Sequence, residues 1–454
     1  MSELITRRSF AGALSPIVQL PIARAQQKRH PNVLLILADD LGYGDIGLHG
    51  APDVRTPNMD ALAALGVRFT NFYSNCPVCS PTRAALLTGC YPETVGVPGV
   101  IRRRPETSWG YLSPKARLLP EVLSKAGYQT ALVGKWHLGE EPYNLPNARG
   151  FQEFRGMLGG MVMDYYNHQG HQDDQPDVWH NGTRLRQQGH ATDLFTTWAQ
   201  ETIASWRKAS KPAFLYLAYN APHNPVQPPA EWLDRVRKRE PSANEKRAKL
   251  IALIEHMDDG IGRVMKTLRD TGQLDNTLVI FTSDNGGDCP EEARNLPWRG
   301  CKGEMYEGGI RVPGIVSWPG QVKAGSQCDE VALSMDLAPT ICEVAGLRMP
   351  SATHGLSLVE TIKQGRALPA RDLFWTRLEG VAFAGNPIHA VRRGDWKLVH
   401  NTPFTPLELY NLKNDPYERT DLAKANPKMR NDLAAALMKH VHRGGQVPWH
   451  PPDE

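Results

Sequence analysis

The chain alternates short apolar runs with segments whose apolar residues recur at helical spacing. The run NVLLILA at 32–38 has no polar position after the first, which is typical of a strand buried on both faces. Similar runs occur at 130–133, 214–219 and 277–282, and helical patterns occur at 58–65, 119–126, 192–206 and 251–268. This alternation predicts an α/β fold, with a large, mostly parallel sheet flanked by helices on both faces.

The pattern changes from about residue 346. Short strands are predicted at 374–375, 390–391, 396–399 and 407–410, with a plausible hairpin turn at Arg393-Gly394-Asp395 and a closing helix at 426–440. We therefore expect a signal peptide at 1–28, a catalytic domain at 29–350 and a small C-terminal α+β domain with a short antiparallel sheet at 351–454.

Composition narrows the possible partners. The chain has 454 residues, of which 41% are apolar and 22% are charged, so it can bury a large core. Its formal net charge is +4, and acidic and basic residues are interspersed. No basic block indicates nucleic acid, and no apolar segment reaches transmembrane length, so we expect neither a nucleic-acid partner nor a stable membrane anchor.

The first residues have the pattern of an export signal. Arg7 and Arg8 precede a mildly apolar stretch at 11–23, and Ala23-Arg24-Ala25 offers a small-x-small cleavage site. A twin arginine before a weakly apolar segment predicts a bacterial Tat signal, the Tat translocon as a partner, and a periplasmic or secreted protein. The alternative is an unstructured tail that happens to contain two arginines.

Polar residues follow four of the predicted strands, at the point where each strand ends. Because ligands of open parallel sheets bind beyond the carboxyl ends of the strands, we expect these side chains to meet in one site. They are Asp39 and Asp40, Lys135 and His137, His223, and Asp284 and Asn285.

Four of these residues offer only oxygen ligands. Asp39, Asp40, Asp284 and Asn285 favour calcium or magnesium over zinc or copper. Three converging carboxylates would also repel one another unless a cation lay between them. The sequence therefore predicts a site for one hard divalent cation.

The segment from Cys79 to Gly89 predicts a helix preceded by a cysteine. Ser80 is a suitable N-cap, Pro81 suits the first turn and Gly89 suits the C-terminal stop. Cys79 would then lie where free N–H groups and the helix dipole favour an anion. A capped helix with a small buried thiol is the alternative. Cys76 and Cys79 have CxxC spacing, but no second CxxC completes a zinc site.

These residues also carry a family resemblance. Cys79-x-Pro81-x-Arg83, followed by AALLTG, resembles the signature of the type I sulfatases, whose cysteine is oxidised to Cα-formylglycine. Blocks at 31–44, 127–139, 278–287 and 302–313 resemble sulfatase blocks in the family's order, and 393–398 and 408–412 resemble its second domain. The resemblance implies the alkaline-phosphatase superfamily fold and a formylglycine-generating enzyme as a maturation partner.

The resemblance also implies a role for each site residue. The aldehyde at position 79 would hydrate, one hydroxyl would attack sulfur, and the other would later expel the sulfate. Asp284 is the expected proton acceptor of the attack, and either Lys302 or His223 would protonate the departing alcohol. The implied assignments are one calcium ion on Asp39, Asp40, Asp284, Asn285 and modified Cys79, the hydrated aldehyde held by Arg83 and Lys135, proton removal by His137, and sulfate oxygens on Lys302 and His223.

We therefore expect a sulfatase that acts on an aryl sulfate or on a sulfated carbohydrate such as sulfated N-acetylgalactosamine. Segments 164–168 and 179–182 resemble stretches of sulfatases that act on such glycans, and Trp109, Tyr165, Trp179 and Trp298 could stack on sugars or lie in the core. A formylglycine-dependent phosphate or phosphonate hydrolase is the main alternative, and a binding module with a dead site is a weaker one. Cys90 and Cys301 are expected to be small packing residues.

Overall fold

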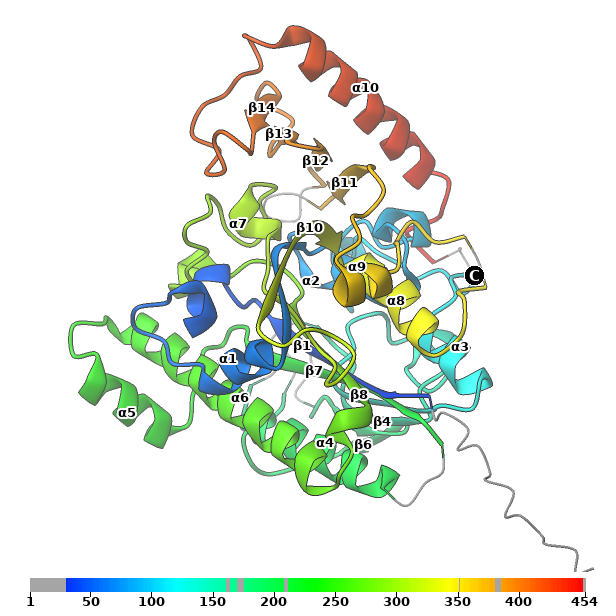
Figure 1. The fold of residues 1–454 in the computed structure, drawn as a ribbon, viewed down its shortest axis with the longest axis vertical. Helices are drawn as coiled ribbons and strands as arrows, with labels where there is room; N and C mark the ends of the chain where they lie inside the picture. The colour runs from blue at the N-terminus through cyan, green and yellow to red at the C-terminus, as the bar shows by residue number, and fades with distance from the viewer. Residues whose placement is uncertain are drawn as a thin grey trace, which may run out of the picture.

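The computed structural model describes residues 30–160, 164–169, 175–207, 211–350, 352–379 and 385–451. Figure 1 shows a large central sheet between helices and a smaller sheet beneath a long C-terminal helix. The predicted fold class is confirmed. The large sheet has the strand order β10 (Ser326–Leu333), β2 (Gly66–Tyr73), β9 (Gly314–Ser317), β8 (Thr277–Ser283), β1 (Asn32–Asp39), β7 (Ala213–Pro222), β3 (Gln129–Lys135), β4 (Glu153–Met157), β5 (Val178–His180) and β6 (Thr183–Leu185).

The centre of this sheet is parallel. β1 pairs in parallel with both β7 and β8, so that Leu35 lies beside Tyr216 on one side and Ile280 on the other. β9 runs antiparallel to both β8 and β2, which makes the sheet mixed. The apolar runs predicted the four central strands. β2, β9 and β10 were not predicted, because they are short or half polar and their sequences do not form a continuous apolar run.

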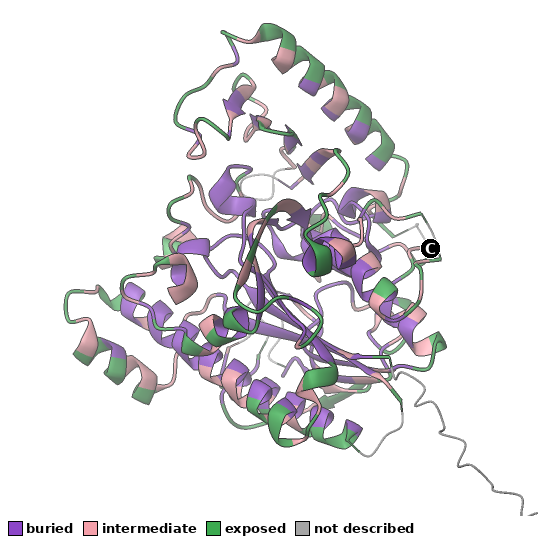
Figure 2. Ribbon diagram, viewed as in Figure 1, coloured by how far each residue is buried: buried purple, intermediate pink, exposed green. Residues whose placement is uncertain are grey.

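Helices bury both faces of the sheet, and β1 contributes to both layers. Leu34 and Ile36 pack in one apolar cluster, whereas Val33, Leu35 and Leu37 pack in the other, as the two-residue period of a strand requires. Figure 1 shows the two groups of helices on opposite sides, and Figure 2 shows the buried strands between them. The first group is α1 (Pro57–Ala64), α4 (Ala191–Trp206), α5 (Ala230–Arg239) and α6 (Glu245–Asp270), and the second is α2 (Cys79–Thr88), α3 (Leu119–Lys125), α8 (Leu337–Val344) and α9 (Val359–Gln364).

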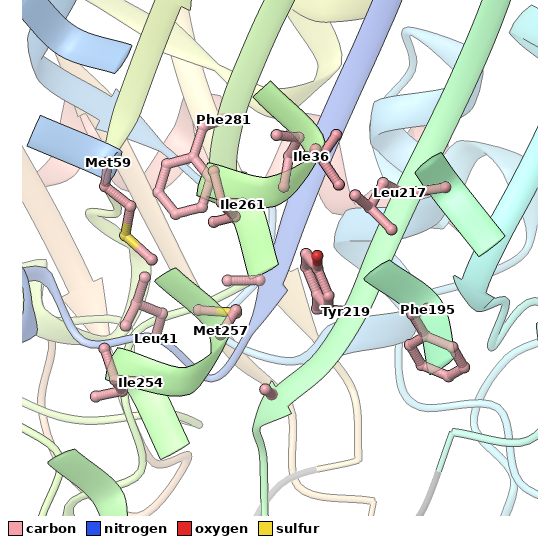
Figure 3. Close-up of a cluster of buried hydrophobic side chains, with 14 of the residues drawn as sticks. Ile36, Leu41, Met59, Phe195, Leu217, Tyr219, Ile254, Met257, Ile261 and Phe281 are labelled. Atoms are coloured by element: carbon pink, nitrogen blue, oxygen red, sulfur yellow. The ribbon is translucent and has the colours of Figure 1, made fainter. Parts of the chain in front are cut away.

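The contacts of the first layer are mainly between strand and helix side chains. Most large apolar side chains of the two elements are less than 2% exposed and interdigitate, so water is excluded from the centre of this layer. Figure 3 shows Ile36, Leu217 and Phe281 of the strands beside Phe195, Ile254, Met257 and Ile261 of the helices.

The smaller sheet is antiparallel and lies between α10 (Pro427–Gly444) and the larger part of the molecule. One face packs Val391, Leu398 and Leu409 against Leu433 and Leu437 of α10. The other face packs against residues around α2 and α7 (Glu307–Ile310). Its strands are β11 (Asp372–Arg377), β12 (Ile388–Arg393), β13 (Trp396–His400) and β14 (Glu408–Asn411), in that order. Because Leu358 and Ile362 still pack with the second layer, the boundary at residue 350 stays a prediction.

A buried ion network joins the two sheets. The Lys397 ammonium lies 2.8 Å from a carboxylate oxygen of Glu307 and 2.8 Å from one of Glu418, and all three side chains are fully buried. The Tyr73 hydroxyl donates to Glu307 at 2.6 Å. A single lysine therefore compensates two carboxylates at this interface, with help from Arg311 at 3.2 Å.

Two local predictions were wrong. Cys301 is not a small packing residue, because it forms a disulfide with Cys289 that closes the loop before Lys302. Ser80 is not the N-cap of α2, since the cap is the extended residue Val78 and the helix begins at Cys79. The αL residue Gly89 ends the helix as predicted.

Cys90 is buried in the second apolar layer, as predicted for a packing residue. The predicted signal peptide at 1–28 lies outside the described residues. Within the ranges that the structure describes, no helix combines the length and the apolar character needed to span a membrane.

The buried network generates a prediction of stability. Lys397→Met removes the positive charge that pairs with the buried carboxylates of Glu307 and Glu418. The free energy of unfolding should therefore fall by about 3–5 kcal/mol. Urea denaturation followed by fluorescence measures this change. Lys413→Met, at an exposed lysine of the same part of the chain, is the control and should leave the transition within experimental error. Equal transitions for the two variants would contradict the importance of this network.

Candidate active site

The four predicted strand ends meet in one buried cluster. Asp39 ends β1, Lys135 ends β3, and Asp284 directly follows β8. The Lys135 ammonium donates to Asp39 at 2.5 Å, and the backbone N–H of Asp40 donates to Asp284 at 3.2 Å. His223 follows β7, and its Nε2 lies 3.6 Å from a carboxylate oxygen of Asp40. The predicted convergence of these residues is therefore present.

Helix α2 brings Cys79 and Arg83 to the cluster. Residues four apart share a helix face, so the first residue and the one on the next turn reach the same site. Ligand atoms of Asp39, Cys79 and Asp284 all lie within 4.8 Å of one another. The Arg83 guanidinium donates to Asp284 at 2.9 and 3.1 Å and to the carbonyl of Lys135 at 3.0 Å.

Three cations balance three carboxylates in this cluster. Lys135 pairs with Asp39, Arg83 with Asp284, and Lys302 with Asp40 at 2.6 Å. Burial alone would raise the pKa of Asp39, but Lys135 and the other cations hold it well below its usual range. Burial, together with repulsion from Asp39, raises the pKa of Asp284 to about 7. The two neighbouring carboxyl groups therefore have very different pKa values, lowered for Asp39 and raised for Asp284.

The oxygen atoms of the cluster fit a hard cation. Oδ1 of Asp39 and Oδ1 of Asn285 are buried without a hydrogen-bond partner, which is unusual for polar atoms inside a protein. The amide nitrogen of Asn285 donates to Asp40 at 2.8 Å and to the carbonyl of Gly286 at 2.9 Å, and this fixes the orientation of its oxygen. Carboxylate and amide oxygens are the ligands that calcium and magnesium prefer. These residues can hold such an ion.

In a second group of possible ligands, nearly all ligand atoms already have partners. Ligand atoms of His190, Asp193 and His256 also lie within 4.8 Å of one another. Both ring nitrogens of His190 already have partners, namely the carbonyl of Gln227 and the N–H of Thr192. Asp193 pairs with Arg263 at 2.9 Å as well as with His256. Nδ1 of His256 is the one ring nitrogen of this group that is buried without a partner, so the group offers a cation no pair of unpartnered ligand atoms.

The Cys79 thiol is poorly suited to act as a nucleophile itself. It is buried at the N-terminus of α2, and burial raises its pKa above the ordinary value although Lys135 and Lys302 favour the thiolate. The uncharged thiol is the weaker nucleophile. The structure shows no bond between Cys76 and Cys79, and both are free thiols.

His137 is held in one tautomer. Its Nε2 lies 3.0 Å from the carbonyl of Ile101, to which it donates, and its Nδ1 is buried without a partner. Burial, reinforced by Lys135, keeps the pKa of His137 well below its usual range. The ring is therefore neutral, with a free lone pair on Nδ1 that can accept a proton. A side chain at Gly160 would overlap this ring, since a Cβ there would lie 1.8 Å from it.

The cluster is most open beside Lys302 and His223. The side chains of these two residues are 19% and 11% exposed, whereas those of Arg83, Lys135, Asp39 and Asp284 are at most 1% exposed. Nδ1 of His223 donates to the carbonyl of Asn224 at 2.7 Å, so its Nε2 faces the carboxylate of Asp40. Burial and the charge of Lys302 lower the pKa of His223.

Some contacts around the cluster could not be predicted from the residue types. Ile101 acts through its backbone carbonyl and Gly160 through the absence of a side chain, so neither residue type indicates the contact. Tyr165 cannot stack on a sugar, because it is fully buried and its hydroxyl donates to the carbonyls of Asn220 and His223. Trp109, Trp179 and Trp298 are partly exposed.

Comparison with known proteins identifies the family of the chain. The family model "Sulfatase" matches residues 31–347, and the model "N-sulphoglucosamine sulphohydrolase, C-terminal" matches residues 301–444. Human N-acetylgalactosamine-6-sulfatase is 36% identical, with 93% of this chain and 87% of that protein covered. Human arylsulfatase A is 33% identical, with 93% of this chain and 90% of that protein covered.

Solved structures show the same architecture. Ps i-CgsB in complex with k-i-k-neocarrahexaose superposes with a TM-score of 0.84 at 30% identity, covering 93% of this chain and 95% of that one. The phosphonate monoester hydrolase of Agrobacterium radiobacter, at 23% identity and a TM-score of 0.66, shares the fold. The superposition covers 91% of this chain and 96% of the hydrolase chain. The chain belongs to the sulfatase family and is a sulfuric ester hydrolase.

Proposed function

We propose that this sulfatase removes sulfate from a sulfated saccharide, using formylglycine made from Cys79 and one calcium ion. The observation that carries the proposal is the position of Cys79, at a helix N-terminus and within 4.8 Å of the ligand atoms of Asp39 and Asp284. A helix N-terminus favours the sulfate anion, and the unpartnered oxygens of Asp39 and Asn285 favour the cation.

The proposed cofactors have distinct tasks. When bound to Asp39, Asp40, Asp284, Asn285 and modified Cys79, calcium supplies positive charge that draws electrons from sulfate and lowers the pKa of an attacking hydroxyl. The aldehyde at position 79 supplies that hydroxyl as its hydrate and allows sulfate to be released afterwards.

The side chains around position 79 hold the reacting groups and move protons. Arg83 and Lys135 orient the nucleophile, and Asp284 accepts its proton. His137 then takes a proton on Nδ1, the free nitrogen, so that sulfate can be expelled. Because these groups are fixed by buried contacts, they need little rearrangement during the reaction.

Lys302 and His223 are proposed to bind sulfate oxygens, and one of them protonates the departing alcohol. They are the most exposed members of the cluster, so the alcohol must lie on their side. An alkoxide of a sugar is a poor leaving group, which makes a proton donor necessary at this position. A saccharide would therefore approach the cluster from the side of Lys302 and His223.

The saccharide substrate is supported by the relatives. A relative 36% identical to this chain is named an N-acetylgalactosamine-6-sulfatase, and a structure at 30% identity contains a neocarrahexaose. Both cover most of the chain. We propose a sulfated galactose or N-acetylgalactosamine unit as the substrate class. A panel of defined sulfated saccharides, with sulfate release measured by ion chromatography, tests this choice.

The modification of Cys79 can be tested directly. When the protein is made together with a formylglycine-generating enzyme, peptide mass spectrometry should show an aldehyde at residue 79 that a hydrazine reagent traps. Cys79→Ala should be inactive, because it lacks the nucleophile. Cys90→Ala is the matched control at the other end of the same helix and should keep most of the activity.

An intact thiol at residue 79 in fully active protein would refute the modification. Efficient turnover of phosphate or phosphonate esters without turnover of any sulfate ester would instead favour the alternative hydrolase.

The two histidines should differ kinetically. His137→Ala should still transfer sulfate to the enzyme but release it slowly, giving a burst and a trapped sulfated peptide. His223→Ala should lose at least about 100-fold in kcat with an unactivated saccharide sulfate and much less with an activated aryl sulfate, because a good leaving group needs no acid. Pre-steady-state kinetics and intact mass spectrometry measure both effects. Equal losses on every substrate, with no trapped species, would show that the division of roles is wrong.

A further inference from the structure

We infer that Glu379 is a positioning residue that holds two proposed catalytic groups, His137 and Lys302, through two separate arginines. The carboxylate lies just beyond β11, in the smaller sheet's part of the chain. It binds both Arg102 and Arg377. Arg102 directly follows Ile101, whose carbonyl orients His137. Arg377 donates to the carbonyl of the residue after Lys302. The inference rests on the proposed roles of His137 and Lys302.

The Glu379 side chain is fully buried and bridges two arginines. One carboxylate oxygen accepts from Nη1 of Arg102 at 2.7 Å and from the backbone N–H of Val100 at 3.3 Å. The other accepts from Nε of Arg377 at 3.1 Å. A buried carboxylate with two arginine donors is held firmly in place, because each of its oxygens already has a partner. Glu379 therefore connects the loop at 98–109 to the end of β11.

The Arg102 arm leads to His137. Ile101, the residue before Arg102, accepts a hydrogen bond from Nε2 of His137 at 3.0 Å through its carbonyl. Its N–H donates to the hydroxyl of Ser80 in the first turn of α2 at 3.1 Å. The backbone at Ile101 thus fixes both the tautomer of His137 and its place relative to the nucleophile. Arg102 holds this backbone by its ion pair with Glu379.

The Arg377 arm leads to Lys302. Nη1 of Arg377 donates to the carbonyl of Gly303 at 2.8 Å, and Gly303 directly follows Lys302. The N–H of Gly303 donates to the carbonyl of Pro77 at 2.9 Å, two residues before Cys79. Gly303 has a φ of +91°, and a Cβ there would lie 2.8 Å from Nη1 of Arg377. A glycine is needed for the arginine to come this close.

β11 supports both arms. The indole N–H of Trp375 donates to the carbonyl of Ser74 at 2.7 Å, on the segment that leads into Cys79. Residues 375–379 thus contact the chain before the nucleophile, the loop that orients His137, and the turn after Lys302. The end of β11 is therefore part of the framework that positions the proposed catalytic groups.

The test begins with Glu379→Gln in the formylglycine-containing, metal-loaded enzyme. The amide keeps the size of the side chain but places its N–H₂ against an arginine that also only donates, so at least one arm loses its anchor. We expect kcat for an unactivated sulfate ester to fall about tenfold or more, with KM changed much less and calcium content unchanged. The sulfated enzyme should also accumulate, because His137 is displaced.

Glu255→Gln is the matched control. Glu255 is a buried carboxylate on α6 that accepts from Arg239 at 2.6 Å and from the backbone N–H of Arg55 at 2.9 Å, remote from the proposed catalytic groups. The same substitution there should affect thermal stability but not kcat per folded molecule. If Glu379→Gln and Glu255→Gln have equal kcat values, the positioning role is overturned.

A double-mutant cycle keeps the inference testable if Glu379→Gln folds poorly. Arg377→Lys retains the charge but loses the two-point hold on Glu379 and Gly303, so kcat/KM should fall in the wild-type background. In the Lys302→Ala background the same change should cost clearly less than in the wild type, because the part of the effect that passes through Lys302 is already lost. If the two losses are additive and Lys302→Ala is itself impaired, the positioning role is wrong but the proposed role of Lys302 stands. A fully active Lys302→Ala would overturn the proposed role of Lys302 together with this arm.

Discussion

The structure depends on the balance of charge in one buried cluster at the carboxyl ends of the central strands. Three carboxylates lie there beside three cationic side chains, and nearly all of these groups are withdrawn from water. Two carboxylates within 4.8 Å repel each other by about 3 kcal/mol or more even at an effective dielectric constant of about 20. The cluster is stable only because Arg83, Lys135 and Lys302 face those carboxylates.

The parallel sheet makes this concentration of charge possible. β1, β3, β7 and β8 run in the same direction, so the residues after each strand arrive at the same edge. Asp40 and His137 adopt positive φ angles of 66° and 58°, which non-glycine residues rarely do. Such backbone strain persists where the surroundings fix it firmly, and here both residues have buried partners at the site.

The sequence predicted the elements whose physical signal is local. The continuous apolar run of β1 and the helical spacing of α4 and α6 gave those elements, and the polar residues after the strands gave the site. Helix α2 was predicted with its cysteine and its glycine stop, but its cap was placed two residues late. The disulfide between Cys289 and Cys301 could not be predicted, because spacing alone does not determine which cysteines meet.

Contacts made through the backbone, or between segments far apart in the chain, could not be predicted from the sequence. The carbonyls of Ile101 and Gly303 hold His137 and Arg377, and any residue type has a carbonyl. Glu379 is separated from Arg102 by 277 positions, and no periodicity links them. The smaller sheet was predicted as a separate unit, and one of its faces packs against residues around α2 and α7 of the larger one.

The central claim is that the cluster binds one calcium ion, and the number of ions bound per chain tests this claim most directly. Purified enzyme that has been stripped with a chelator and reloaded with calcium should contain about one ion per chain by elemental analysis, and activity should return in proportion to that ion. Asp39→Asn should lose the ion, whereas Asp258→Asn, at a buried carboxylate of α6 bonded to Met59, should keep it. Full turnover by metal-free enzyme, or an Asp39→Asn variant that binds calcium as tightly as the wild type, would contradict the account.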